Sequence, residues 1–139
     1  SDNLDICSKM IFIFFLNAEE ATMSISRIGD QLGPYLHTSE IRAVDSYDFW
    51  MSPCYQQDSV AIHFTWKSDG LAGTNALALV EKELAPFNPR PHWGKIFTTT
   101  HQQLKDRYPM LPEFQKLLLD YDPKGKFHNR YLEKHIFGW

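Results

Sequence analysis

The segment Pro89–Lys95, with the sequence PRPHWGK, carries the side chains that most plainly indicate chemistry. Its prolines fix φ and disfavour helix, so Lys95 follows a stiff, extended stretch of chain. Gly94 lets the backbone turn or approach a ligand closely, directly after the titratable ring of His92 and the large ring of Trp93. We therefore expect this segment, called the arm below, to face a ligand. The alternative is a surface loop anchored by Trp93.

A second group of polar residues follows the alternation of two predicted strands. Glu40 and Arg42 are two positions apart, so their side chains leave one face of a strand about 6.5–7 Å apart. His63 and Thr65 repeat this spacing on the next predicted strand. If the two strands are neighbours, the four side chains form a compact polar patch on an otherwise hydrophobic sheet.

These residue types suit a polyhydroxylated substrate. An arginine and a lysine that converge on one oxygen, here Arg42 and Lys95, can stabilise a developing alkoxide or enolate. Glu40 can orient the arginine by bidentate pairing, while His63 and Thr65 can hydrogen-bond further hydroxyls. Each residue also has a structural alternative. A Glu-x-Arg pair on a strand is usually a solvated face, and a histidine among apolar neighbours is usually structural.

Other kinds of site find little support. The sequence has no nucleophile elbow, and Gly70 and Gly73 are too sparse for a phosphate loop. We predict no metal site, because the remaining histidines lack metal-ligand spacing: His37, His101, His128 and His135. A net charge of −3 and a pI near 6.0 argue against nucleic acid as a partner.

The length of 139 residues indicates one domain with a core of its own. The apolar run 10–16 is too short for a membrane span and lacks the flanks of a signal peptide. Cys7 and Cys54 resemble neither a metal pair nor a disulfide framework, so we expect reduced thiols in a cytoplasmic protein.

Hydrophobic periodicity predicts the elements that would position these side chains. Strands are expected at 9–16, 36–44, 59–67 and, briefly, 96–98. Helices are expected after Asn17 as far as Leu32, and at 71–84, 102–107, 113–121 and 129–137. The helix at 113–121 would bury Phe114, Leu117, Leu118 and Tyr121. This order predicts an α+β fold: a two-layer antiparallel sheet with helices mainly on one side, ferredoxin-like in style.

Four segments, taken together, resemble a known family. They are HTSEIR at 37–42, SVAIHFTW at 59–66, RPHWGK at 90–95 and DPKGKFHN at 122–129. In this order and spacing they resemble the C-terminal part of bacterial alditol oxidases. Those enzymes belong to the sugar-alcohol and aldonolactone oxidase branch of the vanillyl-alcohol-oxidase-type flavoproteins. The resemblance covers the chain from about Leu36 onward, and more loosely the part before it.

The resemblance implies that residues 1–139 are a C-terminal substrate-binding, or cap, domain whose N-terminal FAD-binding domain is absent from the chain. The implied reaction moves hydride from the terminal carbinol carbon of an alditol, such as xylitol or sorbitol, to flavin N5. O₂ then reoxidises the flavin and yields H₂O₂. We expect the fragment alone to be colourless and inactive. We also expect it to self-associate through the surface that would meet the FAD domain.

Roles carried over from the resemblance fall on the residues already singled out. Lys95 and Arg42 would be catalytic, contacting the reacting hydroxyl and favouring its deprotonated form. Glu40 would hold that arrangement and bind a neighbouring hydroxyl, with His63 and Thr65 binding hydroxyls farther along.

His92 would lie close to the flavin edge and count as cofactor-binding. The histidine that attaches FAD covalently in many members belongs to the missing domain, so none of the histidines here receives that role. Two alternatives remain open. One is an aldonolactone oxidase or dehydrogenase of the same family, and the other is a cofactor-free binding or interaction module.

Overall fold

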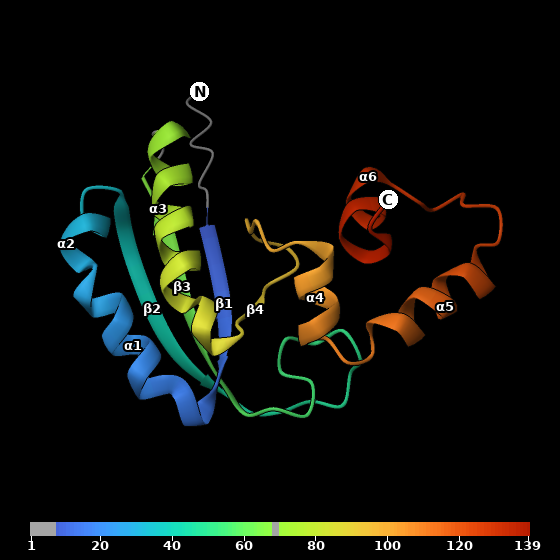
Figure 1. Ribbon diagram of the computed structural model, residues 1–139, viewed down its shortest axis with the longest axis horizontal. Helices are drawn as coiled ribbons and strands as arrows, with labels where there is room; N and C mark the ends of the chain where they lie inside the picture. Colours follow the sequence, from blue (N-terminus) through green and yellow to red (C-terminus); the bar gives the residue numbers. More distant parts are fainter. Residues whose placement is uncertain (1–7, 68–69) are drawn as a thin grey trace.

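The protein is built on a four-stranded antiparallel sheet with the order β2-β3-β1-β4 (Figure 1). The computed structural model describes residues 8–67 and 70–139. The strands are β1 (Ser8–Phe14), β2 (Leu36–Val44), β3 (Ser59–Trp66) and β4 (Arg90–Pro91). The predicted α+β class and antiparallel sheet are confirmed.

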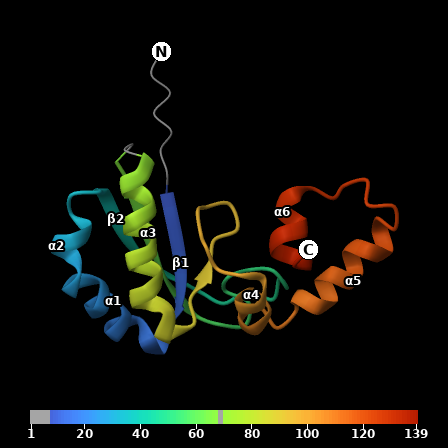
Figure 2. The same cartoon turned by 45° about the horizontal axis from the view of Figure 1, so that its top comes forward.

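Helices cover one side of this sheet and form a second group beside it. The first group comprises α1 (Ala18–Arg27), α2 (Gly29–Leu32) and α3 (Gly70–Leu84), with short 3₁₀ turns at Phe15–Asn17 and Ala85–Phe87. The second comprises α4 (His101–Arg107), α5 (Leu111–Tyr121), α6 (Arg130–Leu132) and a π-helical turn at Glu133–Phe137. Figure 2 shows this second group beyond the β4 edge. No helix in the described part of the chain is long and apolar enough to cross a membrane.

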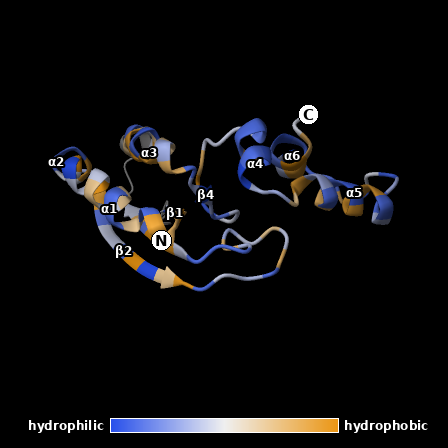
Figure 3. Ribbon diagram, turned by 60° about the horizontal axis from the view of Figure 1, so that its bottom comes forward, coloured by the Kyte–Doolittle hydropathy of each residue, from blue (hydrophilic) through white to orange (hydrophobic). Residues whose placement is uncertain are grey.

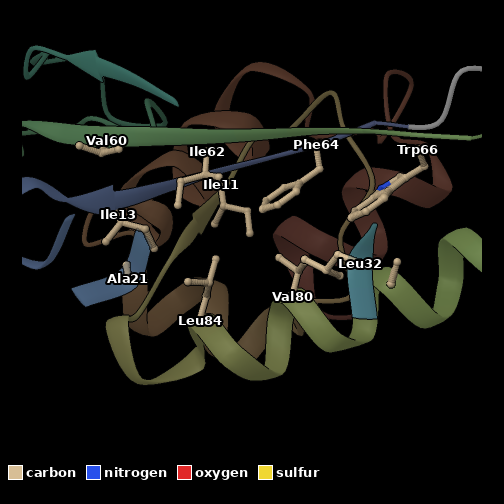
Figure 4. Close-up of a cluster of buried hydrophobic side chains, with 11 residues drawn as sticks. Ile11, Ile13, Ala21, Leu32, Val60, Ile62, Phe64, Trp66, Val80 and Leu84 are labelled. Carbon is tan, nitrogen blue, oxygen red and sulfur yellow. The ribbon is translucent and has the colours of Figure 1, made fainter. Parts of the chain in front are cut away.

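The main core lies between the sheet and α3. The alternation predicted for β3 is confirmed, because Val60, Ile62, Phe64 and Trp66 are all buried toward the helices (Figure 4). Across from them α3 contributes Ala76, Val80 and Leu84 to the same cluster. Burying each large apolar side chain fully is worth about 1.5–3 kcal/mol, so this layer supplies much of the stability of the fold.

The opposite face of the sheet is the one that carries polar side chains. Figure 3 shows α1, α2 and α3 gathered on the other side of the sheet. The loop 45–58 covers only part of this face, where buried Cys54 packs against Phe12 and Ala61. Cys54 is a free thiol, while Cys7 lies outside the described residues. We call this surface the open face.

The strand predicted at 96–98 is wrong, since no strand forms there. The sheet gains its fourth strand from the arm itself, where Arg90 pairs with Phe12 and Pro91 pairs with Ile11. A proline lacks the N–H that a ladder needs, and an edge strand tolerates this because one side of it has no partner strand. The prolines of the arm, which disfavour helix, are therefore compatible with a short edge strand at Arg90–Pro91.

One predicted buried face also needs correction. Helix α5 begins at Leu111, which is fully buried, and packs with Phe114 and Leu118 against the second hydrophobic cluster. Leu117 and Tyr121, which we expected to be buried, are exposed, Tyr121 at 84%. Figure 1 shows that the C-terminal end of α5 extends past the other helices.

Candidate active site

One row of side chains crosses the whole open face. Glu40 on β2 pairs with His63 on β3, and His63 pairs with Met10 on β1. The N–H of His92, just after β4, donates to the carbonyl of Met10 at 3.0 Å. With strands about 4.8 Å apart, the row runs roughly 14 Å from β2 to the far edge. The two polar strands are therefore neighbours, which is the condition under which the sequence predicts a polar patch.

Glu40 is the centre of the polar group on β2. Its Oε2 accepts a hydrogen bond from Nη2 of Arg42 at 2.6 Å, and Nδ1 of His63 lies 3.5 Å from the same oxygen. Glu40 and Arg42 are both exposed, and an exposed pair adds at most about 1 kcal/mol to stability. The pair is therefore available to a ligand without cost to the fold.

The two predicted residues of β3 differ in their surroundings. Nε2 of His63 is buried and has no hydrogen-bond partner among residues 8–67 and 70–139. Thr65 lies on the same face, opposite Thr38 on β2 and Ser8 on β1, and is half-buried. Nε2 of His63 can bind a ligand only if the atoms that cover it move, whereas Thr65 lies half-buried on the same face.

The arm leaves the ladder and returns to it around Lys95. After His92 bonds to Met10, the next bond of the ladder runs from the N–H of Ile96 to the carbonyl of Ser8, at 3.1 Å. In an unbroken strand residue 94 would take that place, so two extra residues are inserted. An insertion of this kind bends a strand and redirects a side chain. The N–H of Lys95 donates to the carbonyl of His92 at 3.1 Å and closes the turn.

His92 is held in one tautomer. Its Nδ1 accepts the N–H of Gly94 at 3.0 Å, so in the neutral ring Nε2 carries the proton. The ring also stacks on Phe12 with centroids 6.3 Å apart. Burial lowers the pKa of His92 below its usual value, and the nearby charges of Lys95 and His63 lower it further. At neutral pH His92 is therefore a neutral hydrogen-bond donor.

The two predicted catalytic cations approach from opposite edges of the sheet. Lys95 is half-buried, and its ammonium has neither a hydrogen bond nor a carboxylate partner within the described ranges. Arg42 stands on β2, with β3 and β1 between it and the arm. Lys95 lies near enough to His92 to lower its pKa, and none of the described hydrogen bonds or ion pairs joins Lys95 to Arg42.

Trp93 anchors the arm, as in the alternative we considered for it. Its Nε1–H donates to the carbonyl of Met51 at 2.8 Å, and its ring lies 4.9 Å from that of Tyr108. The hydroxyl of Tyr131 donates to the carbonyl of Trp93 at 2.6 Å. The arm is therefore anchored by Trp93 and also contains His92 and Lys95.

Arg90 has a structural role that sequence reasoning missed. Its guanidinium donates to the carbonyls of Arg107 at 2.8 Å, Tyr55 at 2.9 Å and Pro53 at 3.2 Å. It also lies 5.5 Å from the ring centroid of Tyr108, within cation–π range. An arginine between two prolines was the only local signal, because its partners lie far away in the sequence.

No metal centre adds to this arrangement. Within residues 8–67 and 70–139, no three side chains of His, Cys, Asp or Glu gather closely enough to hold an ion. The polar groups of the open face are hydrogen-bond donors, acceptors and two cations. They suit a neutral ligand rich in hydroxyls.

The fold and this face define an α+β domain with a polar, cation-bearing sheet surface. The chain belongs to the D-arabinono-1,4-lactone oxidase family, whose family model matches residues 17–135. The resemblance drawn from the four sequence segments is thereby confirmed.

Several proteins are similar in sequence to most of this chain. It is 41% identical over 122 residues to an alditol oxidase of Streptomyces sp. (strain IKD472 / FERM P-14339), covering 88% of this chain and 29% of that protein. It is 34% identical over 101 residues to an L-gulonolactone oxidase of Scyliorhinus torazame, covering 70% and 23%. An L-gulono-1,4-lactone dehydrogenase of Mycobacterium tuberculosis is 28% identical over 103 residues, covering 73% and 23%. The chain spans less than a third of the length of these relatives.

Proposed function

We propose that the chain is the substrate-binding part of an FAD-dependent oxidase that oxidises the terminal CH–OH of an alditol such as xylitol or sorbitol. The row of Glu40, His63, Met10 and His92 across the open face is the observation that carries this proposal. The alditol oxidase of Streptomyces, at 41% identity, supports the choice of substrate class.

The polar side chains in and beside this row would each have a distinct task toward a polyol. Lys95 and Arg42 favour the alkoxide form of the reacting hydroxyl, because a cation near an oxygen stabilises its negative charge. Glu40 accepts a hydrogen bond from the neighbouring hydroxyl and keeps Arg42 oriented. His63 and Thr65 bind hydroxyls farther along the substrate.

The residues present fit a flavin partner. His92 offers a neutral Nε2–H donor on the open face, which suits the polar edge of an isoalloxazine ring. FAD, when bound, accepts hydride at N5 and passes the electrons to O₂, which yields H₂O₂. We propose that residues 1–139 form the cap domain and that an FAD domain of the same parent polypeptide is their partner. The chain alone would then be colourless and inactive.

The decisive experiment is an H₂O₂-release assay on the flavin-loaded parent protein with xylitol, sorbitol and aldonolactones side by side. Faster release with the alditols is expected. Preference for a lactone would favour an aldonolactone oxidase, and turnover only with an artificial acceptor would favour a dehydrogenase. A parent protein that binds no flavin would contradict the proposal and favour an interaction module.

We also propose that the sheet and its helices form a ferredoxin-like unit. The order β2-β3-β1-β4 supports this, because β1–α1–β2 and β3–α3–β4 each link two strands that flank a third. A crystal structure with another strand order would contradict it.

The fragment by itself should self-associate. Large apolar side chains such as Phe15 and Leu16, the latter 80% exposed, and Phe49 in the loop 45–58 support this expectation. Size-exclusion chromatography that gives a clean monomer at high concentration would count against it. A cytoplasmic location stays a prediction based on the cysteines.

A further inference from the structure

The backbone on both sides of Lys95 is held by β1. His92 bonds to the carbonyl of Met10 before the inserted residues, and Ile96 bonds to that of Ser8 after them. Lys95 directly precedes Ile96, so its Cα can stay in place only while Ile96 remains on the ladder. The contacts that hold Ile96 therefore determine the position of the Lys95 ammonium.

Two charged side chains on the helix-covered side hold the segment that follows. Nζ of Lys9 lies 2.5 Å from Oε1 of Glu81 and 3.5 Å from the carbonyl oxygen of Ile96. The carboxylate of Glu81 accepts the backbone N–H of Thr98 at 2.9 Å, and Oε2 also accepts the hydroxyl of Thr98. Both ends of the segment 96–98 are thus connected to one ion pair.

Packing holds the middle of this segment from one side only, where Phe97 lies against the second hydrophobic cluster and its ring is 4.7 Å from that of His135. A cavity of about 310 Å³ lies next to the segment, and its walls include Lys9, Glu81, Pro91, Thr98 and Arg107. On the side of this cavity, Ile96 and Thr98 are held by hydrogen bonds from Lys9 and to Glu81.

The ion pair is itself costly to disturb on one side only. Lys9 is 1% exposed, and removing one partner of a buried pair leaves the other charge without compensation. Burial alone would raise the pKa of Glu81, but hydrogen bonds from Lys9 and Thr98 and the charge of Lys9 outweigh it and lower that pKa. Burial lowers the pKa of Lys9 although Glu81 opposes this.

We propose that Glu81 and Lys9 are positioning residues for Lys95: by holding Ile96 and Thr98 they determine where the Lys95 ammonium lies on the open face. Both side chains lie on the helix-covered side, since Glu81 comes from α3 and Lys9 pairs in register with the core residue Phe64. The role of Lys95 in oxidation rests on the function proposed above. Its placement beside His92 can be measured independently.

A matched pair of variants separates positioning from folding. K9M/E81Q and K9M/E81L both remove the two charges together, so neither leaves a buried charge unpaired. The first retains a side-chain oxygen that can accept the N–H of Thr98, whereas the second retains none. A difference between them therefore reports the connection to Thr98 rather than the loss of the ion pair.

The readouts are the titration of His92 and the turnover of the flavin-loaded parent oxidase. Lys95 and His63 are the charged or titratable groups that lower the pKa of His92, so a displaced Lys95 raises it. ¹³Cε1-histidine NMR follows this titration, and K95M gives the value without the lysine charge. K9M/E81Q loses the Lys9 bond to Ile96 but keeps an acceptor for Thr98, so its His92 pKa should stay nearer the wild-type value than in K9M/E81L, with kcat within about threefold of wild type. In K9M/E81L the pKa should move toward the K95M value, and kcat should fall at least about tenfold.

Equal His92 pKa values and equal kcat in the two double variants would overturn the proposal. Should either variant fail to fold, T98V removes only the hydroxyl bonded to Glu81, and T99V is its control on the same cavity wall. We expect T98V, not T99V, to raise the His92 pKa and to reduce kcat about threefold. If the parent oxidase is inactive on every polyol, the proposed function is wrong. The NMR comparison of His92 pKa values would still test whether Glu81 and Lys9 position Lys95.

Discussion

Glu40 and His63 face each other across neighbouring strands, and one oxygen of the carboxylate serves two partners. Oε2 accepts from Arg42 at 2.6 Å and lies 3.5 Å from Nδ1 of His63. The hydrogen bond orients Arg42 directly, and it places the guanidinium and the ring of His63 around one carboxylate oxygen. The arrangement lies in the open, so it orders groups for a ligand rather than for the fold.

Replacing Glu40 with glutamine should therefore affect binding more than stability. E40Q retains the size of the side chain but removes the charge that orients Arg42. Loss of hydrogen bonds to a charged group, about 1.5–3 kcal/mol, corresponds to a roughly 10–100-fold drop in kcat/KM for an alditol. Glu20 is exposed on α1, so E20Q is the control, and the melting temperature of E40Q should match that of E20Q. A kcat/KM equal to that of the control would contradict the role of Glu40.

Loss of the Lys95 ammonium should reduce the rate strongly and leave the fold intact. K95M removes a cation that has no partner among the described residues, so stability should change by less than about 0.5 kcal/mol. If the cation stabilises a developing alkoxide, kcat should fall about 10²–10³-fold. Steady-state H₂O₂ release measures this rate. K105M is the control, because Lys105 is exposed on α4. Unchanged activity in K95M would rule out the assignment.

The hydroxyl of Tyr108 should contribute to the stability of the arm. This fully buried side chain donates to the carbonyl of Pro91 at 2.9 Å. Y108F leaves that carbonyl without its donor, at a cost of about 1–2 kcal/mol in the free energy of unfolding. Urea unfolding measures the change, and Y121F is the matched control because Tyr121 is exposed. A loss no larger than in the control would show that the bond adds nothing.

Acid should weaken the protein partly through Glu81. Its hydrogen bonds with Lys9 and Thr98 lower its pKa below the usual 4.5, so the folded state favours the carboxylate. This contribution to stability is fully present above the unfolded pKa and is lost as pH falls through the lower folded value. Unfolding by urea, followed by tryptophan fluorescence from pH 7 downward, should show a wild-type advantage over E81Q that shrinks with acidity. An advantage independent of pH would contradict this origin.

Much of the site could be predicted from local pattern alone. Alternation with a period of two determines that Glu40 and Arg42 share one strand face, and that His63 and Thr65 share another. The same alternation predicted the buried series from Val60 to Trp66, which the structure confirms. These predictions succeeded because they depend only on neighbouring positions in the chain.

The tertiary structure decided how those local faces meet. Register alone puts Glu40 opposite His63, and a two-residue insertion against β1 brings Lys95 near His92 at the edge of the sheet. Arg90, which read as part of a ligand-facing arm, instead holds three distant carbonyls, and Lys9 is buried against Glu81 seventy-two positions away. Such pairings join segments far apart in the chain, and no local propensity encodes them. The sequence by itself determined which residues could act, and only the folded sheet determined which of them stand together.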